Sequence, residues 1–264
     1  MLERYPATQI MFLDIETTSK TDKFSELNER DQNNFLKKFK RKGTQEILDE
    51  VGPDGKKHTK AQLTKLKEKR WSELAPLSSL FGRILCISVG FLVKDQENGG
   101  FTMRRKSYYN EDEKILLQEF VNGPLKPHLD NPMGKDSYAL SAFNGKVFDF
   151  PFISTRLIVN RIPLPSAFDY VEKKPWEIPY FIDLKVLTSF NVFDGANSMD
   201  SWAAVMEIPS SKDQMDGSEV KDAFWKDKDL AGIVRYCEKD VVVLSELHLA
   251  VTGVEGEVRL PDGR

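Results

Sequence analysis

The chain has 264 residues, of which 40% are hydrophobic and 30% charged, and its formal net charge is −3. This composition is typical of a soluble globular protein and excludes a low-complexity chain. The slightly negative charge disfavours a protein held on nucleic acid by bulk electrostatics. Apolar runs stay well below the roughly 18 residues of a membrane span, and the first ten residues lack the hydrophobic region of a signal peptide. Cys86 and Cys237 each lie in an apolar pattern typical of buried free thiols. We therefore expect a cytoplasmic protein without membrane association.

Residues 9–18, QIMFLDIETT, predict a buried β-strand that ends on two carboxylates, Asp14 and Glu16. Because side chains alternate between the two faces of a strand, Asp14 and Glu16 are expected side by side, with Ile15 pointing the other way into the core. Two like charges held close together repel, and a divalent cation between them relieves the repulsion. Mg²⁺ or Mn²⁺ suits such oxygen ligands, although the same pair is also typical of a solvated strand end.

The chain is polar between about residues 19 and 80, and residues 35–71 hold 12 Lys and Arg against 5 Asp and Glu. Apolar residues recur at helical spacing in two groups, within residues 27–39 and 63–74. We predict a helical, basic insertion after the first strand. Two interpretations stay open: its cations guide a polyanion, or it is a solvated pair of helices.

Strand and helix patterns alternate through the rest of the chain. Strands are predicted at residues 82–93, 101–109, 138–143 and 180–184, and helices at residues 111–121, 148–160, near 187, 198–208 and 227–251. Asn110 is the expected N-cap of the first of these helices. Five strands that feed helices in this way predict an α/β fold with a mixed sheet flanked by helices. We expect one domain over residues 1–252 and a loose tail over residues 253–264.

Two further segments carry residues suited to metal chemistry. Asp149 follows a strand-to-helix junction, where a carboxylate lies beside exposed backbone N–H groups. Tyr236 and Asp240 are four residues apart on the last helix, so they share one face. A hydroxyl and a carboxylate directed at one place suit the positioning of water beside a metal ion. Taken singly, Asp149 is also typical of a helix cap and Tyr236 with Asp240 of a surface pair. Asp183, which follows a strand, is interpreted as a helix N-cap.

In this order the segments resemble the motifs of the DEDD superfamily of 3′-5′ exonucleases, which have a ribonuclease H-like fold. Residues 13–18 (LDIETT) resemble the first exonuclease motif, residues 144–149 (NGKVFD) the second, and residues 236–240 (YCEKD) the third, in its tyrosine form. The other branch has a histidine five residues before the last aspartate, where this chain has Arg235. Residues 81–90 and 215–220 are similar to the stand-alone bacterial branch related to the exonuclease domain of family B DNA polymerases. The resemblance extends over residues 10–249 and covers the insertion least.

The resemblance implies a site for two divalent ions, Mg²⁺ or Mn²⁺. Asp14, Glu16 and Asp240 would hold one ion and Asp14 the second, and Asp149 would complete the site through water. One ion activates the attacking water, and the other stabilises the leaving 3′ oxygen. Tyr236 would orient the attacking water, because an ordinary tyrosine pKa near 10 makes it a poor base at neutral pH.

Three residues are expected near the terminal nucleotide. Phe148 stacks on the terminal base, which tolerates any sequence, or packs against the sheet. Asn144 and the main chain of Thr17 contact the nucleotide or hold the loop.

We therefore predict a metal-dependent 3′-5′ exonuclease that acts on single-stranded or frayed DNA and releases nucleoside 5′-monophosphates. A separate polymerase or repair protein is the partner that proofreading or DNA repair would require. An exoribonuclease stays open, because the contact that recognises a 2′-hydroxyl cannot be located from the sequence. The alternative from another class is an inactive nucleic-acid-binding module, which the presence of all four carboxylates and the tyrosine disfavours.

Overall fold

The computed structural model describes residues 5–39, 58–126, 137–189, 198–211 and 215–261. The chain divides into two compact units, one formed by Met1–Glu16 and Ile84–Arg264 and the other by Thr17–Arg83. The second unit contains the predicted insertion at residues 19–80, of which residues 40–57 lie outside the described part. The domain organisation, one domain over residues 1–252 with a helical insertion, therefore stays a prediction.

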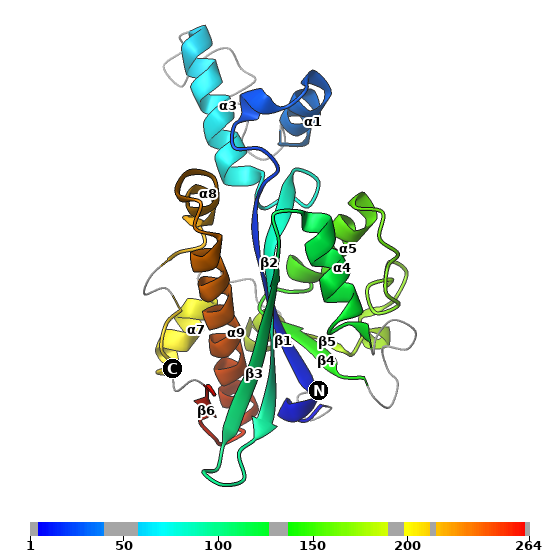
Figure 1. The fold of residues 1–264 in the computed structure, drawn as a ribbon, viewed down its shortest axis with the longest axis vertical. Coiled ribbons are helices and arrows are strands. Elements are labelled where there is room, and N and C mark those ends of the chain that lie inside the picture. Colours follow the sequence, from blue (N-terminus) through cyan, green and yellow to red (C-terminus); the bar gives the residue numbers. More distant parts are fainter. Residues whose placement is uncertain (1–4, 40–57, 127–136, 190–197, 212–214, 262–264) are drawn as a thin grey trace. The chain divides into compact units, whose positions relative to one another are not determined.

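The first unit is built on a six-stranded sheet in the order β5-β4-β1-β2-β3-β6 (Figure 1). The strands are β1 (Ile10–Ser19), β2 (Gly82–Lys94), β3 (Phe101–Tyr109), β4 (Ala139–Ala142), β5 (Phe181–Asp183) and β6 (Val258–Arg259). β4 runs parallel to both β1 and β5, whereas β2 and β3 are antiparallel. The predicted mixed α/β fold is confirmed, but the sheet has six strands rather than five, because β6 adds to the edge strand β3.

Helices follow the strands close to the predicted places. In the first unit they are α4 (Glu113–Asn122), α5 (Asp149–Val159), α6 (Leu184–Ser189), α7 (Met199–Val205), α8 (Val220–Asp222) and α9 (Leu230–Thr252), with 3₁₀ turns at Ala7–Gln9 and Pro175–Glu177 and a π-helical turn at Ala223–Asp227. The N-cap of α4 is Asp112, whose side chain accepts the N–H of Lys114. The prediction of Asn110 as this cap is wrong, because Asn110 lies two residues before Asp112 and accepts the N–H of Asp112. No helix in the described ranges is long and apolar enough to cross a membrane.

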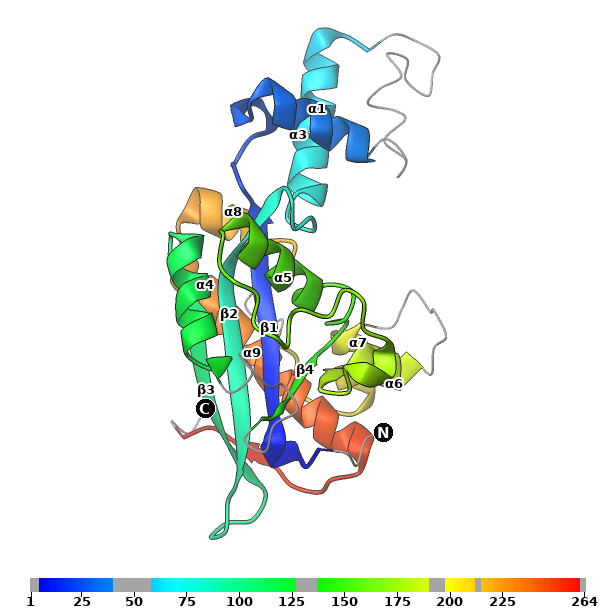
Figure 2. The ribbon, with the colours of Figure 1, turned by 90° about the vertical axis from the view of Figure 1, so that its right-hand side faces the viewer.

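Side-chain alternation along β1 divides the core of the first unit between the two faces of the sheet. Met11, Leu13 and Ile15 pack with α4 and α5. Ile10 and Phe12 point the other way and pack with α9. Figures 1 and 2 show α9 on one side of the sheet and α4 and α5 on the other. By the same period of two, Asp14 and Glu16 belong to the face that α9 covers.

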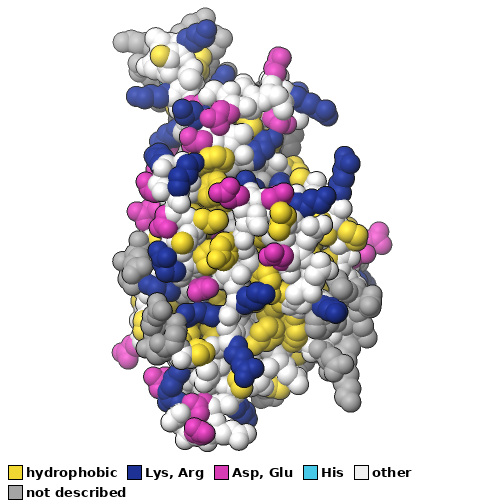
Figure 3. All heavy atoms as spheres, viewed as in Figure 1, with side chains coloured by type: hydrophobic (Ala, Val, Ile, Leu, Met, Phe, Trp, Pro, Cys, Tyr) yellow, Lys and Arg dark blue, Asp and Glu magenta, His cyan; other side chains and the backbone are white. Residues whose placement is uncertain are grey.

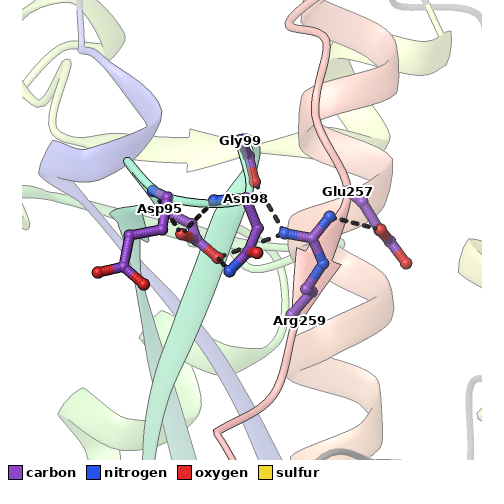
Figure 4. A network of polar contacts seen from close by, with 6 residues as sticks. Asp95, Asn98, Gly99, Glu257 and Arg259 are labelled. Atoms are coloured by element: carbon purple, nitrogen blue, oxygen red, sulfur yellow. Dashed lines mark hydrogen bonds and ion pairs between the residues drawn. The ribbon is translucent and has the colours of Figure 1, made fainter.

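The C-terminal segment is attached to the hairpin that joins β2 and β3. β6 pairs with β3, and the N–H of Phe101 donates to the carbonyl oxygen of Glu257 at 2.9 Å. Figure 4 shows the Arg259 guanidinium at the centre of this contact, where it donates to Asp95 Oδ2 at 3.3 Å, to the Gly99 carbonyl at 2.9 Å and to the Glu257 carboxylate at 3.0 Å. The prediction of a loose tail is therefore wrong for residues 257–259, because a free strand edge and a hairpin carbonyl supply partners for them.

The second unit has an aromatic core of its own. It contains a 3₁₀ turn at Phe24–Glu26 and the helices α1 (Glu29–Phe39) and α3 (Lys60–Leu74). Five buried rings form the core: Phe24, Phe35, Phe39, Trp71 and Phe81. The centroid of the Phe35 ring lies 4.8 Å from that of Phe39 and 5.0 Å from that of Trp71. The two helices inferred from the apolar spacing are thus held together by ring packing within this unit.

Candidate active site

The end of β1 places two carboxylates opposite a third from α9. One oxygen each of Asp14, Glu16 and Asp240 lies within 4.8 Å of the others. Asp14 and Glu16 share a face of β1 because they are two residues apart, and Ile15 between them is buried against α4 and α5. Glu16 is 9% exposed and Asp240 7%. The three carboxylates therefore form one largely buried cluster.

Helix α9 contributes three neighbouring side chains to this cluster. The Tyr236 hydroxyl donates to the carboxylate of Asp240, one turn further along the helix. The Cys237 thiol donates to Asp14 at both its carbonyl oxygen, 3.4 Å away, and its Oδ2, 3.3 Å away. The helix thus supplies a carboxylate, a hydroxyl that donates to it, and a thiol that donates to Asp14 on β1.

Asp149 joins the site from the first turn of α5, where it is 4% exposed. Its carboxylate accepts the backbone N–H of Ile15, so it is fixed to β1 between Asp14 and Glu16. Asp149 is also close enough to both carboxylates for its charge to act on them. The structure therefore brings together all five residues predicted to carry the chemistry.

Burial and mutual repulsion disfavour the charged forms of Asp14, Glu16 and Asp149. Burial, followed by the charges of Asp240, Glu16 and Asp149, raises the pKa of Asp14 well above 3.8. Burial and Asp240 likewise raise the pKa of Glu16 well above 4.5. Burial raises the pKa of Asp149 to about 7. Burial and the adjacent carboxylates also raise the pKa of Tyr236 above 10, so its phenol stays protonated at neutral pH.

The donor set fits a hard divalent cation. Each of the three groups that could hold an ion offers carboxylate oxygens, the donor that Mg²⁺ and Mn²⁺ prefer. A bound cation would also lower the raised pKa values, because it favours the charged form of each carboxylate. Asp14, Glu16 and Asp240 are the groups that could hold such an ion directly.

The residues predicted near the nucleotide have structural contacts as well. Phe148 is half-buried and packs against Phe152, with ring centroids 5.4 Å apart. Asn144 is half-buried in a left-handed conformation, with φ of 65°. Thr17 begins the second unit, in which its hydroxyl donates to the carbonyl oxygen of Pro76 at 2.9 Å. The Thr17 hydroxyl therefore holds a loop within the second unit.

Two residues near the site were not assigned a role in it from the sequence. Cys237 was interpreted only as a buried thiol, although its spacing of three from Asp240 puts both on one side of the helix. Asp183 accepts the N–H of Lys185 in the first turn of α6, as its N-cap interpretation expects. It also accepts the N–H groups of Asn144 and Lys146. The parallel pairing of β4 and β5 could have indicated this contact, because the carboxyl ends of parallel strands meet at one edge of a sheet.

Comparison with known families gives this geometry a context. The family described as "Predicted 3'-5' exonuclease related to the exonuclease domain of PolB" matches residues 77–262, more than two thirds of the chain. The chain belongs to this family. Its match includes Asp149, Tyr236 and Asp240 but begins after Asp14 and Glu16. The grouping of Asp14 and Glu16 with Asp240 therefore rests on the geometry of β1 and α9.

Among curated proteins no sequence matches the chain. Among solved structures it is similar to the family B DNA polymerase of the hyperthermophilic archaeon Pyrobaculum calidifontis, with a TM-score of 0.49 and 14% sequence identity. The similarity covers 94% of this chain but only 27% of the polymerase chain.

Proposed function

We propose that the protein hydrolyses phosphodiester bonds at the 3′ end of single-stranded or frayed DNA and releases nucleoside 5′-monophosphates. One observation carries the proposal: in a chain of this exonuclease family, oxygens of Asp14, Glu16 and Asp240 converge within 4.8 Å. Carboxylates with raised pKa values are costly to keep together without a cation, which supports a site built for metal ions.

Four carboxylates would hold the ions: Asp14, Glu16, Asp149 and Asp240. Two Mg²⁺ ions, or Mn²⁺ in their place, supply when bound the activation of water and the stabilisation of charge on the leaving 3′ oxygen.

The side chains around the ions have distinct roles in this proposal. Tyr236 remains protonated, so its hydroxyl orients the attacking water rather than removing a proton. Its hydrogen bond to Asp240 fixes the direction of that hydroxyl. Phe148 stands immediately before Asp149 in the chain and is partly exposed, so it can contact the terminal base. Asn144 and the Thr17 main chain are the remaining proposed contacts of the terminal nucleotide.

Local charge near the site can contribute to binding of the strand. In Figure 3, Lys and Arg side chains lie among Asp and Glu across the face in view. Beside Tyr236, however, a cavity of about 140 Å³ is lined by Arg235 and Lys239. These cations line the cavity together with Asp229 and Tyr236, and they can attract the phosphate of a substrate.

Degradation of end-labelled oligonucleotides tests the proposal. Wild-type protein should shorten a 5′-labelled single strand stepwise from its 3′ end with Mg²⁺ or Mn²⁺, and EDTA should stop the reaction. Asp14→Asn and Asp240→Asn should each lower kcat by about a thousandfold or more. Asp169→Asn, an exposed aspartate outside the cluster, is the matched control and should retain full activity. Undiminished hydrolysis in either cluster variant refutes the assignment.

Matched DNA and RNA strands of one sequence decide between the remaining alternatives. Faster hydrolysis of RNA would make the protein an exoribonuclease instead. Retention of oligonucleotide without hydrolysis under any divalent ion would identify a binding module.

A further inference from the structure

The loop between β4 and α5 determines where Asp149 lies. It begins at Asn144, whose φ of 65° is unusual for a residue with a side chain. The Asn144 carbonyl accepts the N–H groups of Val147 and Phe148 at 3.1 and 3.0 Å. Two residues before Val147, Gly145 leaves no room for a side chain, because a Cβ there would lie 2.5 Å from the Cβ of Ala142. The loop is thus a tight turn that leads directly into the first turn of α5.

Asp183 holds this turn from the end of the neighbouring strand. β4 and β5 are parallel, with Ala142 opposite Asp183, so the turn and the carboxylate leave the sheet at the same edge. Asp183 Oδ1 accepts the N–H of Asn144 at 2.9 Å, and Oδ2 accepts that of Lys146 at 3.0 Å. Oδ1 also accepts the N–H of Lys185 at 3.0 Å. The carboxylate is 3% exposed.

A helix cap alone does not account for these contacts. Capping α6 requires acceptance of an N–H from its own first turn, which the bond from Lys185 satisfies. The other two N–H groups belong to Asn144 and Lys146, which precede Asp183 by 39 and 37 positions in the chain. Hydrogen bonds from backbone N–H groups to an ionised carboxylate are stronger than those between neutral groups. Both carboxylate oxygens of Asp183 therefore accept hydrogen bonds from the turn that leads to Asp149.

We propose that Asp183 is a positioning residue of the exonuclease site: by binding the N–H groups of Asn144 and Lys146, it fixes the turn that sets Asp149 against β1. The inference rests on the proposed function, in which Asp149 is part of the metal site. Residues that orient metal ligands typically affect metal affinity or activity about 10- to 100-fold. The negative charge of Asp183 also reaches Asp149 and is one cause of the raised pKa of that carboxyl.

Two substitutions separate the role in the turn from the role as a cap. Asp183→Asn keeps the shape of the side chain but places an NH₂ group where one oxygen accepted an N–H. Asp183→Ser keeps an oxygen suited to capping α6 but is too short to hold the turn. Asp112→Asn is the matched control, because Asp112 caps α4 through the N–H of Lys114 and lies outside the site.

Each variant is measured for its melting temperature, its kcat and KM on a single-stranded oligonucleotide, the Mn²⁺ concentration for half-maximal rate, and hydrogen exchange of the Asn144 and Lys146 amides. Both Asp183 variants should lower kcat about 10- to 100-fold, change KM less than about threefold, and raise the half-maximal Mn²⁺ concentration. Exchange at the two amides should accelerate. Asp112→Asn should leave the melting temperature nearly unchanged, because asparagine caps a helix about as well as aspartate, and should keep kcat within about twofold of the wild type.

Full kcat in Asp183→Ser, or effects of Asp183→Asn that match those of Asp112→Asn, would overturn the inference and leave Asp183 as a helix cap. If Asp183→Asn does not fold, Asp183→Ser is compared with the wild type and with Asp112→Asn instead. Absence of hydrolysis by the wild type under any divalent ion would count against the proposed function. In that case, unchanged exchange at Asn144 and Lys146 in the variants overturns the positioning role, and faster exchange with weaker Mn²⁺ binding supports it.

Discussion

Replacing Asp149 with asparagine should stabilise the metal-free protein at pH 8. Burial raises the pKa of this carboxyl from 3.8 to about 7 in the folded protein. Between about pH 4 and pH 7 the folded state therefore holds a proton that the unfolded state has lost, and stability falls as the pH rises through that window. Each difference of one in pKa is worth about 1.4 kcal/mol, so ionised Asp149 costs the folded state about 4 kcal/mol above pH 7.

Urea unfolding in EDTA at a series of pH values between 4 and 8 measures this cost. The free energies of unfolding of wild type and Asp149→Asn should agree near pH 4, where Asp149 is neutral. At pH 8 the variant should be more stable by about 2–4 kcal/mol. Loss of the Asp149 charge also removes its repulsion of the Asp14 carboxylate, whose pKa that charge helps to raise. This second effect further stabilises the variant at pH 8. Mg²⁺ should narrow the difference at pH 8, because the ion stabilises the wild-type cluster more.

The control for this experiment is Asp169→Asn, whose carboxylate is exposed and lies outside the cluster. It should follow the wild-type curve over the same pH range. A stability difference between Asp149→Asn and wild type that does not change with pH would refute the reasoning. So would a wild type that is the more stable protein at pH 8 in EDTA.

Three further predictions concern single side chains. Arg156→Met should lower the free energy of unfolding, measured by urea denaturation, by about 3–5 kcal/mol. The reason is that the buried carboxylate of Glu113 loses its bidentate partner. A loss below about 1 kcal/mol would contradict this prediction. Tyr236→Phe should lower kcat about 10- to 100-fold with unchanged Mn²⁺ affinity in a binding titration, because the water loses its orienting hydroxyl; equal kcat would exclude the role. Arg259→Ala should accelerate hydrogen exchange of the Phe101 amide, which bonds to the C-terminal segment, while global unfolding by urea changes little; unchanged exchange would show that β6 pairing alone holds the segment.

Much of the site could be predicted from local periodicity. A spacing of two in a strand placed Asp14 and Glu16 together and turned Ile15 into the core, as the structure has them. A spacing of four in a helix paired Tyr236 with Asp240, and these two side chains share a hydrogen bond. These relations depend only on the repeat of one element, so they can be inferred without knowing the fold.

Contacts between elements could not be predicted in the same way. Asn110 and Asp112 are both suitable caps by residue type, and only the backbone geometry selects Asp112. Residues 257–259 have no strong strand pattern, and their pairing depends on the free edge of β3. The sixth strand and the pairing of residues 257–259 therefore follow from the sheet rather than from local sequence.

The sequence by itself determined the mixed α/β class, the polarity of each main element and the residue types of the candidate site. The tertiary structure decided that oxygens from β1 and α9 lie within 4.8 Å, that Cys237 donates to Asp14, and that Asp183 holds the turn before Asp149. The physical reason is that periodicity fixes only the direction of a side chain on its own element. Distances between residues more than a hundred positions apart depend instead on strand order and on which helix covers which face of the sheet.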